Sequence, residues 1–297
     1  MYVIHPFDPW KSPLCTCPPK YSLDPYTGCG HMCKYCYITS YIKQAFNPRP
    51  KKNLIQRIVK DLKRIDYSRH ISMSNSSDPY TPPEAKLRLT RRVLEVLVSR
   101  GAKVLIITKS TLVVRDIDLL RRGNVSVSIT ITSLNNRVSK TLEPNAPSPY
   151  ERLKALRSLI RNGVPCSVRI DPLIPYINDD YSGIRALVKA LADVGVKHVI
   201  SSTYKARPDS FKRIVKAFVR VREGLKELYF EKGEVVQRYR YLPRSLRYEM
   251  LKKVAELVRE EGMTFAVCRE GFGDLNSGET CDGSHLIPIR RCIQNVG

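Results

Sequence analysis

The sequence contains no hydrophobic run long enough to cross a membrane. Apolar stretches such as Lys103 to Thr108 have the length of a strand, whereas a spanning helix needs roughly 18 residues. Residues 1–25 also lack the basic and then apolar segments of a secretory signal peptide. We therefore expect a protein without membrane insertion that stays in the reducing cytoplasm, where its nine cysteines are thiols rather than disulfides.

Acidic residues are scarce relative to basic ones. The chain has 51 Lys and Arg against 28 Asp and Glu, a formal net charge of +23. The basic clusters lie at residues 47–52, 88–92, 205–222 and 238–247, and Tyr239, Tyr241 and Tyr248, within or next to the last of them, could stack on bases. A thermophile-like charged surface explains a high charge content but not its one-sided sign. We expect nucleic acid as a partner or substrate.

Short β-branched runs alternate with segments that carry apolar residues at helical spacing. The expected strands are residues 70–75, 103–108, 125–132, 165–171, 197–202 and 263–268, and the expected helices are 53–65, 89–100, 149–162, 181–194, 208–222 and 244–260. Because parallel strands need a helical crossover, this alternation predicts an α/β fold. We predict a partial (β/α)6 barrel of the TIM type over residues 26–268, with an N-terminal arm at 1–25 and a Cys- and Gly-containing C-terminal tail at 269–297.

Polar residues follow several of the expected strands. In barrels of this type the chemistry lies at the carboxyl ends of the strands, so these residues are candidates for ligand binding. They are Ser77, Asp78, Lys109, Thr130, Thr132, Arg169 and Asp171.

Cys29, Cys33 and Cys36 form a CxxxCxxC motif with Tyr35 just before the third thiol. Three thiolates on one short loop can hold three irons of a [4Fe-4S] cluster and leave the fourth open to a small molecule. A structural zinc site, with His31 as fourth ligand, is the alternative. Zinc usually binds cysteine pairs, however, and no second pair follows at the usual distance, so the spacing favours the cluster.

The remaining cysteines suggest a second metal site. Cys15 and Cys17 precede the motif, whereas Cys268, Cys281 and Cys292 lie in or next to the irregular tail. We predict a second iron-sulfur cluster or a zinc ion on the three C-terminal thiols, completed by Cys15 or Cys17. The loose spacing fits isolated, reduced cysteines equally well. His285, close to this tail, is expected to form hydrogen bonds rather than to bind metal.

The cysteine motif resembles that of the radical S-adenosylmethionine (SAM) superfamily, and further segments resemble its spore photoproduct lyase, or DNA repair photolyase-like, family. The matching pieces are residues 26–37, Ser77-Asp78-Pro79-Tyr80, Ile107-Thr108-Lys109-Ser110, Leu142-Glu143-Pro144 and residues 169–175. The resemblance covers about residues 20 to 205 and implies a radical SAM barrel. It also implies a [4Fe-4S] cluster on Cys29, Cys33 and Cys36, SAM at the open iron, an external electron donor and a 5′-deoxyadenosyl radical.

The same resemblance implies roles for the strand ends. Tyr35 would lie near the adenine of SAM, while Ser77, Lys109 and Thr130 or Thr132 would hold its amino acid and ribose parts. Asp78, Arg169 and Asp171 join them as cofactor-binding candidates. For the two threonines, packing in the barrel interior is the alternative, and Asp171 could instead cap the turn at Pro172.

One departure from the family concerns the hydrogen donor. The spore enzymes carry a hydrogen-donating cysteine before the Ser-Asp segment, where this chain has Asn75. We therefore do not expect repair of thymine dimers by that route. Cys166 in the fourth strand is a candidate substitute and Tyr37 a candidate hydrogen relay, although both fit a packing role.

These observations predict a radical SAM enzyme, lyase- or transferase-like, that repairs or modifies DNA or RNA. One alternative is radical modification of a protein or small metabolite. Another is a zinc-stabilised, non-catalytic nucleic-acid-binding protein. No feature of the sequence indicates an oligomeric state.

Overall fold

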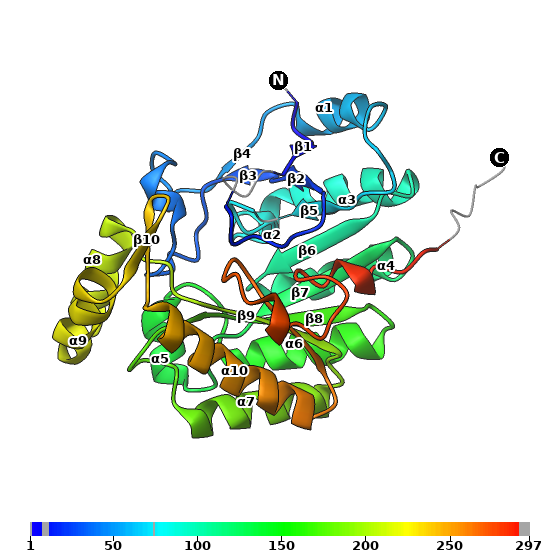
Figure 1. Cartoon of the computed structure of the whole chain (residues 1–297). Coiled ribbons are helices and arrows are strands. Elements are labelled where there is room, and N and C mark those ends of the chain that lie inside the picture. The colour runs from blue at the N-terminus through cyan, green and yellow to red at the C-terminus, as the bar shows by residue number, and fades with distance from the viewer. Residues whose placement is uncertain (1, 8–11, 74, 291–297) are drawn as a thin grey trace, which may run out of the picture.

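The computed structural model describes residues 2–7, 12–73 and 75–290, and its centre is one eight-stranded sheet (Figure 1). In spatial order the strands are β1 (His5–Pro6), β2 (Tyr21–Leu23), β5 (Ile71–Met73), β6 (Val104–Thr108), β7 (Val125–Thr130), β8 (Cys166–Leu173), β9 (His198–Thr203) and β12 (Thr264–Val267). Only the β1–β2 pair is antiparallel. Within the described residues β1 and β12 remain the two edges, so the predicted partial barrel is confirmed.

All six strands expected from the sequence are present, but β2 was not expected. Its three residues pair in parallel with β5, with Tyr21 opposite Ile71 and Leu23 opposite Met73. A strand this short, directly after two prolines, has no detectable alternation of apolar and polar residues. Part of the segment expected as an arm therefore belongs to the main sheet.

Helices cover the outer face of the sheet. The six expected helices are α1 (Leu54–Asp61), α3 (Leu89–Ser99), α6 (Pro149–Arg161), α7 (Tyr181–Val194), α8 (Pro208–Ala217) and α10 (Arg244–Glu260). Local signals fix several ends: Ser148 and Glu151 form a capping box at the start of α6, and α7 ends at Gly195 with φ 95°. The expected helix at 208–222 stops at Ala217, and the chain continues as a short 3-10 turn and α9 (Arg222–Lys226).

Shorter elements complete the fold. They are α2 (Glu84–Leu87), α4 (Ile117–Leu120), α5 (Asn136–Leu142), the pair β3 (Tyr26–Thr27) and β4 (Arg49–Pro50), and the hairpin β10 (Glu234–Val236) and β11 (Tyr239–Tyr241). In Figure 1, α8, α9 and the β10 hairpin form a group to one side of the sheet. This group has its own apolar cluster, which includes Tyr204, Phe211, Ile214, Leu225 and Tyr229.

No helix in the described part of the chain combines the length and apolarity needed to cross a bilayer.

The outer layer of helices predicts where substitutions destabilise the protein. Leu94 of α3 is fully buried, so Leu94→Ala should lower the free energy of unfolding by about 2–5 kcal/mol. Leu87 is 48% exposed, so Leu87→Ala should change it by less than about 1 kcal/mol. Urea denaturation followed by circular dichroism measures both, and equal losses would contradict this packing.

Candidate functional site

The carboxyl ends of the strands and the cysteine loop enclose one cavity of about 540 Å³. Among its lining residues are Cys29, Cys33, Tyr35, Cys36, Tyr37, Asn75, Asp78, Lys109, Thr130, Arg169, Asp171, Lys205, Tyr239 and Arg269. The structure therefore brings together residues that are up to 240 positions apart in the sequence.

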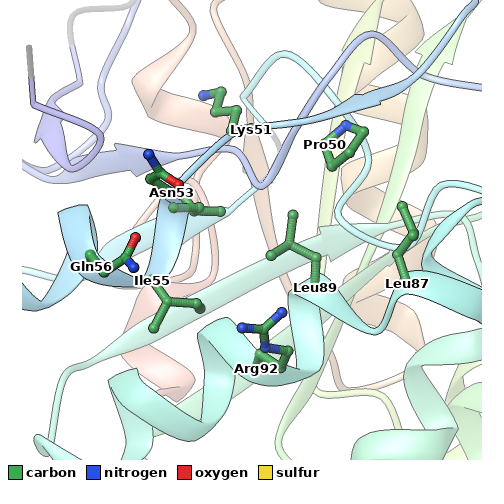
Figure 2. A pocket seen from close by; sticks show the side chains of 9 residues that line it. Pro50, Lys51, Asn53, Ile55, Gln56, Leu87, Leu89 and Arg92 are labelled. Atoms are coloured by element: carbon green, nitrogen blue, oxygen red, sulfur yellow. The ribbon is translucent and has the colours of Figure 1, made fainter.

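A second pocket, of about 440 Å³, lies between β4, α1 and the start of α3 (Figure 2). Its walls are mostly apolar and carry Lys51 and Arg92. Among the described residues, no cysteine and none of the predicted site residues lines it.

The cysteine loop is closed at its base by a short β-pair. Thr27 of β3 lies opposite Arg49 of β4, and the Cys29 amide donates to the Ala45 carbonyl at 2.7 Å. Gly28, with φ 85°, is required at this turn, because a Cβ there would lie 2.8 Å from the Ala45 oxygen. The loop thus begins in a conformation that only glycine adopts without strain.

Neighbouring segments hold the rest of the loop backbone. The Gly30 amide donates to the Thr81 hydroxyl at 2.8 Å, and the Asn145 side chain donates to the Gly30 carbonyl at 3.0 Å. The Lys34 amide donates to the Leu142 carbonyl at 2.8 Å. Segments that follow β5 and β7 therefore fix the loop over the cavity.

Helix α8 holds the other end of the loop. Arg213 donates from Nε to the Lys34 carbonyl at 3.0 Å and from Nη2 to the Cys36 carbonyl at 2.6 Å. Asp209, one turn earlier, pairs with Arg213 at 3.1 Å and accepts a hydrogen bond from Thr39. The Arg213 guanidinium therefore holds the loop backbone just before Tyr35 and just after Cys36.

The three loop thiols lie on the cavity wall. Burial raises the pKa of Cys29 and Cys33 to about 12 and that of Cys36 to about 11, so without a cation nearby they are protonated at neutral pH. In the described part of the chain, no three His, Cys, Asp or Glu side chains converge on a single ion. Thiolates on separate corners of a cluster do not need to converge, so this donor set fits an iron-sulfur cluster better than one zinc ion.

His31, the fourth ligand of the zinc alternative, is occupied elsewhere. Its Nε2 lies 3.2 Å from the Asp78 carboxylate and its Nδ1 lies 3.3 Å from the Asn145 carbonyl. Both ring nitrogens therefore lie beside protein oxygens, which disfavours His31 as the fourth ligand of a zinc ion.

Tyr35 and Lys109 face each other across the cavity wall. The Tyr35 hydroxyl donates to Glu143, and the Lys109 Nζ lies 5.6 Å from the centre of the Tyr35 ring. Glu143 also pairs with Arg152 at 2.5 Å, both side chains being buried. Burial lowers the pKa of Lys109, but the Cys33 sulfur, when it is ionised, and the Glu143 carboxylate raise this pKa above its usual value overall, so Lys109 stays cationic. This wall can bind an anionic group beside an aromatic surface.

Asp78 has no free oxygen. It accepts hydrogen bonds from the Thr108 hydroxyl at 2.7 Å and from the amides of Tyr80 at 2.9 Å and Lys109 at 2.8 Å. Burial raises its pKa, but His31 and these hydrogen bonds lower it to about 2 overall. Its contacts hold the ends of β5 and β6 together, which positions Lys109.

Arg169 and Asp171 form a pair on the wall that β8 contributes. Their side chains lie 2.8 Å apart, and the Ser202 hydroxyl donates to Asp171 at 2.6 Å. Asp171 is thus held by side chains of two neighbouring strands. It lines the cavity, and the cis bond between Asp171 and Pro172 lies within β8 rather than in a turn that Asp171 caps.

Of the predicted residues that the structure describes, Ser77, Thr132, Cys166 and Cys281 do not line the cavity. Thr132 donates to Glu143 at 3.4 Å, behind the wall, whereas Thr130 does reach the cavity. Ser77 is buried, and its hydroxyl has no hydrogen-bond partner among the described residues. Cys166 lies at the opposite end of β8 from the mouth, with its thiol 3.3 Å from the Val164 carbonyl. The pattern of apolar and polar residues in the sequence does not show how far from the cavity each of these side chains lies.

Several cavity residues were not expected from the sequence. Lys205 pairs with the buried Glu270 at 2.9 Å, beyond the ends of β9 and β12, and Arg269 lies 4.9 Å from the centre of the Tyr239 ring. The run Cys268-Arg269-Glu270 follows a strand as the other polar ends do, and that position was the available signal. Tyr239 and Tyr241 are only 4% and 0% exposed, so the prediction that they stack on bases at the outer surface is wrong.

The second set of cysteines is partly brought together. Cys15, Cys17 and Cys268 line the same cavity, and the Cys281 sulfur lies 3.5 Å from that of Cys17. Cys292 lies outside the described residues. His285 contacts Thr280 at 2.9 Å through Nδ1, in line with the expected hydrogen-bonding role.

The sequence matches the description of the radical SAM superfamily over residues 23–188, more than half of the chain. An uncharacterised protein of Methanocaldococcus jannaschii is 35% identical over 181 residues, which cover 59% of this chain and 66% of that protein. A radical SAM Nα-GlyT isomerase of Pseudomonas phage M6 is 27% identical over 83% of this chain and 53% of that protein. This chain therefore spans about half the length of the phage relative.

Solved structures share the fold. A spore photoproduct lyase variant with bound AdoMet and dinucleoside spore photoproduct has a TM-score of 0.62, with 19% identity over 81% of this chain and 72% of that chain. Streptococcus suis SuiB bound to the precursor peptide SuiA has a TM-score of 0.56, with 13% identity over 83% and 48% of the two chains. At these identities the likeness concerns the fold alone, and it agrees with the predicted architecture.

The donor set predicts which cysteines bind iron. Replacing any of Cys29, Cys33 or Cys36 by Ala should remove about four irons per chain relative to the unchanged protein after anaerobic reconstitution. Cys166→Ala is the matched control and should keep its full iron content, because that thiol lies away from the cavity. Iron and sulfide analysis measures the content of each variant. Loss of iron from the Cys166→Ala control alone would contradict the assignment of Cys29, Cys33 and Cys36 as cluster ligands.

The contacts of α8 predict that Arg213 positions the loop without binding iron. Arg213→Ala removes charged hydrogen bonds of about 1.5–3 kcal/mol each, so a chelator should extract the loop iron roughly tenfold faster or more. Lys212→Ala, an exposed neighbour on the same helix, should behave as the unchanged protein. Identical extraction rates for the two variants would refute the positioning role.

Proposed function

The chain belongs to the radical SAM superfamily, and we propose that it is an enzyme that uses a [4Fe-4S] cluster and SAM to modify or repair nucleic acid. The observation that carries the proposal is the shared cavity: the three loop thiols and the polar strand ends line one space. We further propose a cytoplasmic enzyme that receives electrons from an external donor. Its other substrate enters the same cavity.

Cys29, Cys33 and Cys36 would hold the cluster, and its bound SAM would supply a 5′-deoxyadenosyl radical on one-electron reduction. Lys109, half-buried and cationic, would bind the carboxylate of SAM. Tyr35, fixed by Glu143, would present its ring to the adenine. Thr130 and the pair of Arg169 and Asp171 offer polar groups to the ribose from the facing strands, while the cavity walls exclude water.

The hydrogen relay that we favour is Tyr37. Its hydroxyl lines the cavity and donates to the Asn75 carbonyl at 2.7 Å. Asn75 itself is held by Ser22 at 2.7 Å and offers no hydrogen atom comparable to a thiol's. Cys166 does not reach the cavity and is a packing residue in this proposal. A tyrosine relay would distinguish this chain from enzymes that donate from a cysteine at the position of Asn75.

Charge beside the mouth favours a nucleic acid substrate. Helix α8, which holds the cysteine loop, exposes Lys212 and Lys216, and Arg220 follows in the next turn. Phosphates would bind along this side while a base or sugar reached the cavity. Among the proteins of like fold, spore photoproduct lyase has been solved with a dinucleoside photoproduct, which supports this substrate class. SuiB has been solved with a peptide, so a peptide substrate is the outcome against which the proposal is tested.

The deciding experiment is an anaerobic assay of 5′-deoxyadenosine formation from SAM with dithionite. We expect turnover by the reconstituted protein and stimulation by total cellular DNA or RNA. No 5′-deoxyadenosine after full reconstitution would overturn the catalytic assignment. Turnover that nucleic acid leaves unchanged, but that peptides or metabolites stimulate, would overturn only the substrate class.

The basic side of α8 predicts a specific charge dependence. Replacing Lys212, Lys216 and Arg220 by Glu should weaken nucleic acid binding at least roughly tenfold. The slope of log K against log salt concentration should become shallower by about 0.9 for each phosphate contact that is lost. Reversing Lys154, Arg157 and Arg161 on α6, which are also exposed, makes the same charge change on the outer face and should have a smaller effect. Fluorescence anisotropy across salt measures both, and equal losses would indicate only a nonspecific charge effect.

A further inference from the structure

Four cysteines from the two ends of the chain lie near one another, and three of them, Cys15, Cys17 and Cys268, line the cavity. The Cys17 and Cys281 sulfurs are 3.5 Å apart although 264 positions separate them. The Cys15 thiol hydrogen-bonds the Cys17 sulfur, and Cys268 is close enough to interact electrostatically with Cys15 and Cys281. We propose that Cys15, Cys17, Cys268 and Cys281 bind a second iron-sulfur cluster. This site adds to the proposed function, and its existence does not depend on SAM chemistry.

A buried ion pair holds the two ends of the chain together at this site. The Lys20 Nζ lies 2.6 Å from the Asp282 carboxylate, and both side chains are 4% exposed. His70 adds a contact to Asp282 at 3.3 Å. Isolated buried charges are costly, so the pair fixes arm and tail relative to one another. Asp282 directly follows Cys281, and Lys20 Nζ also lies 3.4 Å from the Cys17 sulfur, so the pair sets the spacing of these two thiols.

The tail fits tightly against the inner face of the sheet. A Cβ on Gly283, at φ 80°, would lie 2.9 Å from the Ser167 hydroxyl, and one on Gly278 would lie 2.6 Å from the His198 ring. His285 packs edge-on against His198 with ring centres 4.8 Å apart, and so is not among the proposed ligands. Figure 1 shows the red tail lying across the sheet beside the dark blue N-terminal arm. An irregular segment buried this closely places Cys281 at a defined position.

The chemistry of the group favours a cluster over the alternatives. Four cysteine thiolates are the usual ligands of [2Fe-2S] and [4Fe-4S] clusters. A single zinc ion on the same thiols is the alternative that the test below distinguishes. Lys20 and Arg169 lie beside Cys17 and Cys268 respectively and would offset thiolate charge. Because all four ligands come from protein, no iron of this cluster would be open to SAM or substrate.

The test separates the two sites by mutation. The triple variant Cys29→Ala, Cys33→Ala, Cys36→Ala leaves the second group intact and should retain about two to four irons, with matching sulfide, after anaerobic reconstitution. Mössbauer spectroscopy should show those irons as a fully thiolate-ligated cluster. Adding Cys17→Ala and Cys281→Ala to the triple variant should remove them, whereas adding Cys166→Ala should not. Circular dichroism checks that each variant is folded.

Several results would overturn the inference. One is a folded triple variant that holds no iron and sulfide. Others are zinc in their place, or a Cys17–Cys281 disulfide found by peptide mass spectrometry in anaerobically prepared protein. If the variant lacking Cys17 and Cys281 fails to fold, the iron and sulfide content of the triple variant still decides. A chain that binds this cluster but forms no 5′-deoxyadenosine would contradict the proposed function and leave this site standing.

Discussion

Every strand of the main sheet except β1 runs in one direction, and the site depends on that shared polarity. Because the strands are parallel and neighbours in sequence are neighbours in space, their carboxyl ends meet at one edge. Residues near the end of β8 and residues that follow β5, β6, β9 and β12 thus reach one cavity without long excursions of the chain. The cysteine loop needs only to cross that edge, and its base is the short pair of β3 and β4.

Burying many polar groups at one edge of the sheet costs folding free energy because the groups lose water. Ion pairs between neighbouring side chains offset this cost. Glu143 is neutralised by Arg152, Glu270 by Lys205 and Arg247, and Asp171 by Arg169. Buried pairs contribute little net stability, since desolvation consumes most of their attraction. Their effect is to hold side chains in one orientation, which an enzyme that guides a reactive group requires. Lys109, by contrast, has no salt bridge in the part of the chain that the structure describes, and its ammonium lies over the Tyr35 ring.

The sequence predicted the parts of this architecture that depend on local pattern. The six strands and six helices, and the CxxxCxxC loop, follow from periodicity and spacing within short windows. Features set by tertiary contacts were not predictable in the same way. β2 is too short to show a pattern, and the depth of Cys166 depends on which end of β8 faces the mouth. Tyr239 looked like a surface residue among arginines, but the hairpin turns its ring inward between Arg207 and Arg269.

The two ends of the chain are part of the cavity rather than appendages to it. Cys15, Cys17, Lys20 and Asp282 all line the space that the loop thiols line. Without them the inner face of the sheet, with Ser167 and His198 at the start of β8 and β9, would be open to water on the side opposite the mouth. A radical needs a site from which solvent and stray hydrogen donors are excluded. For the proposed radical chemistry, the Lys20–Asp282 pair would therefore close the end of the cavity opposite the mouth, whichever substrate the mouth admits.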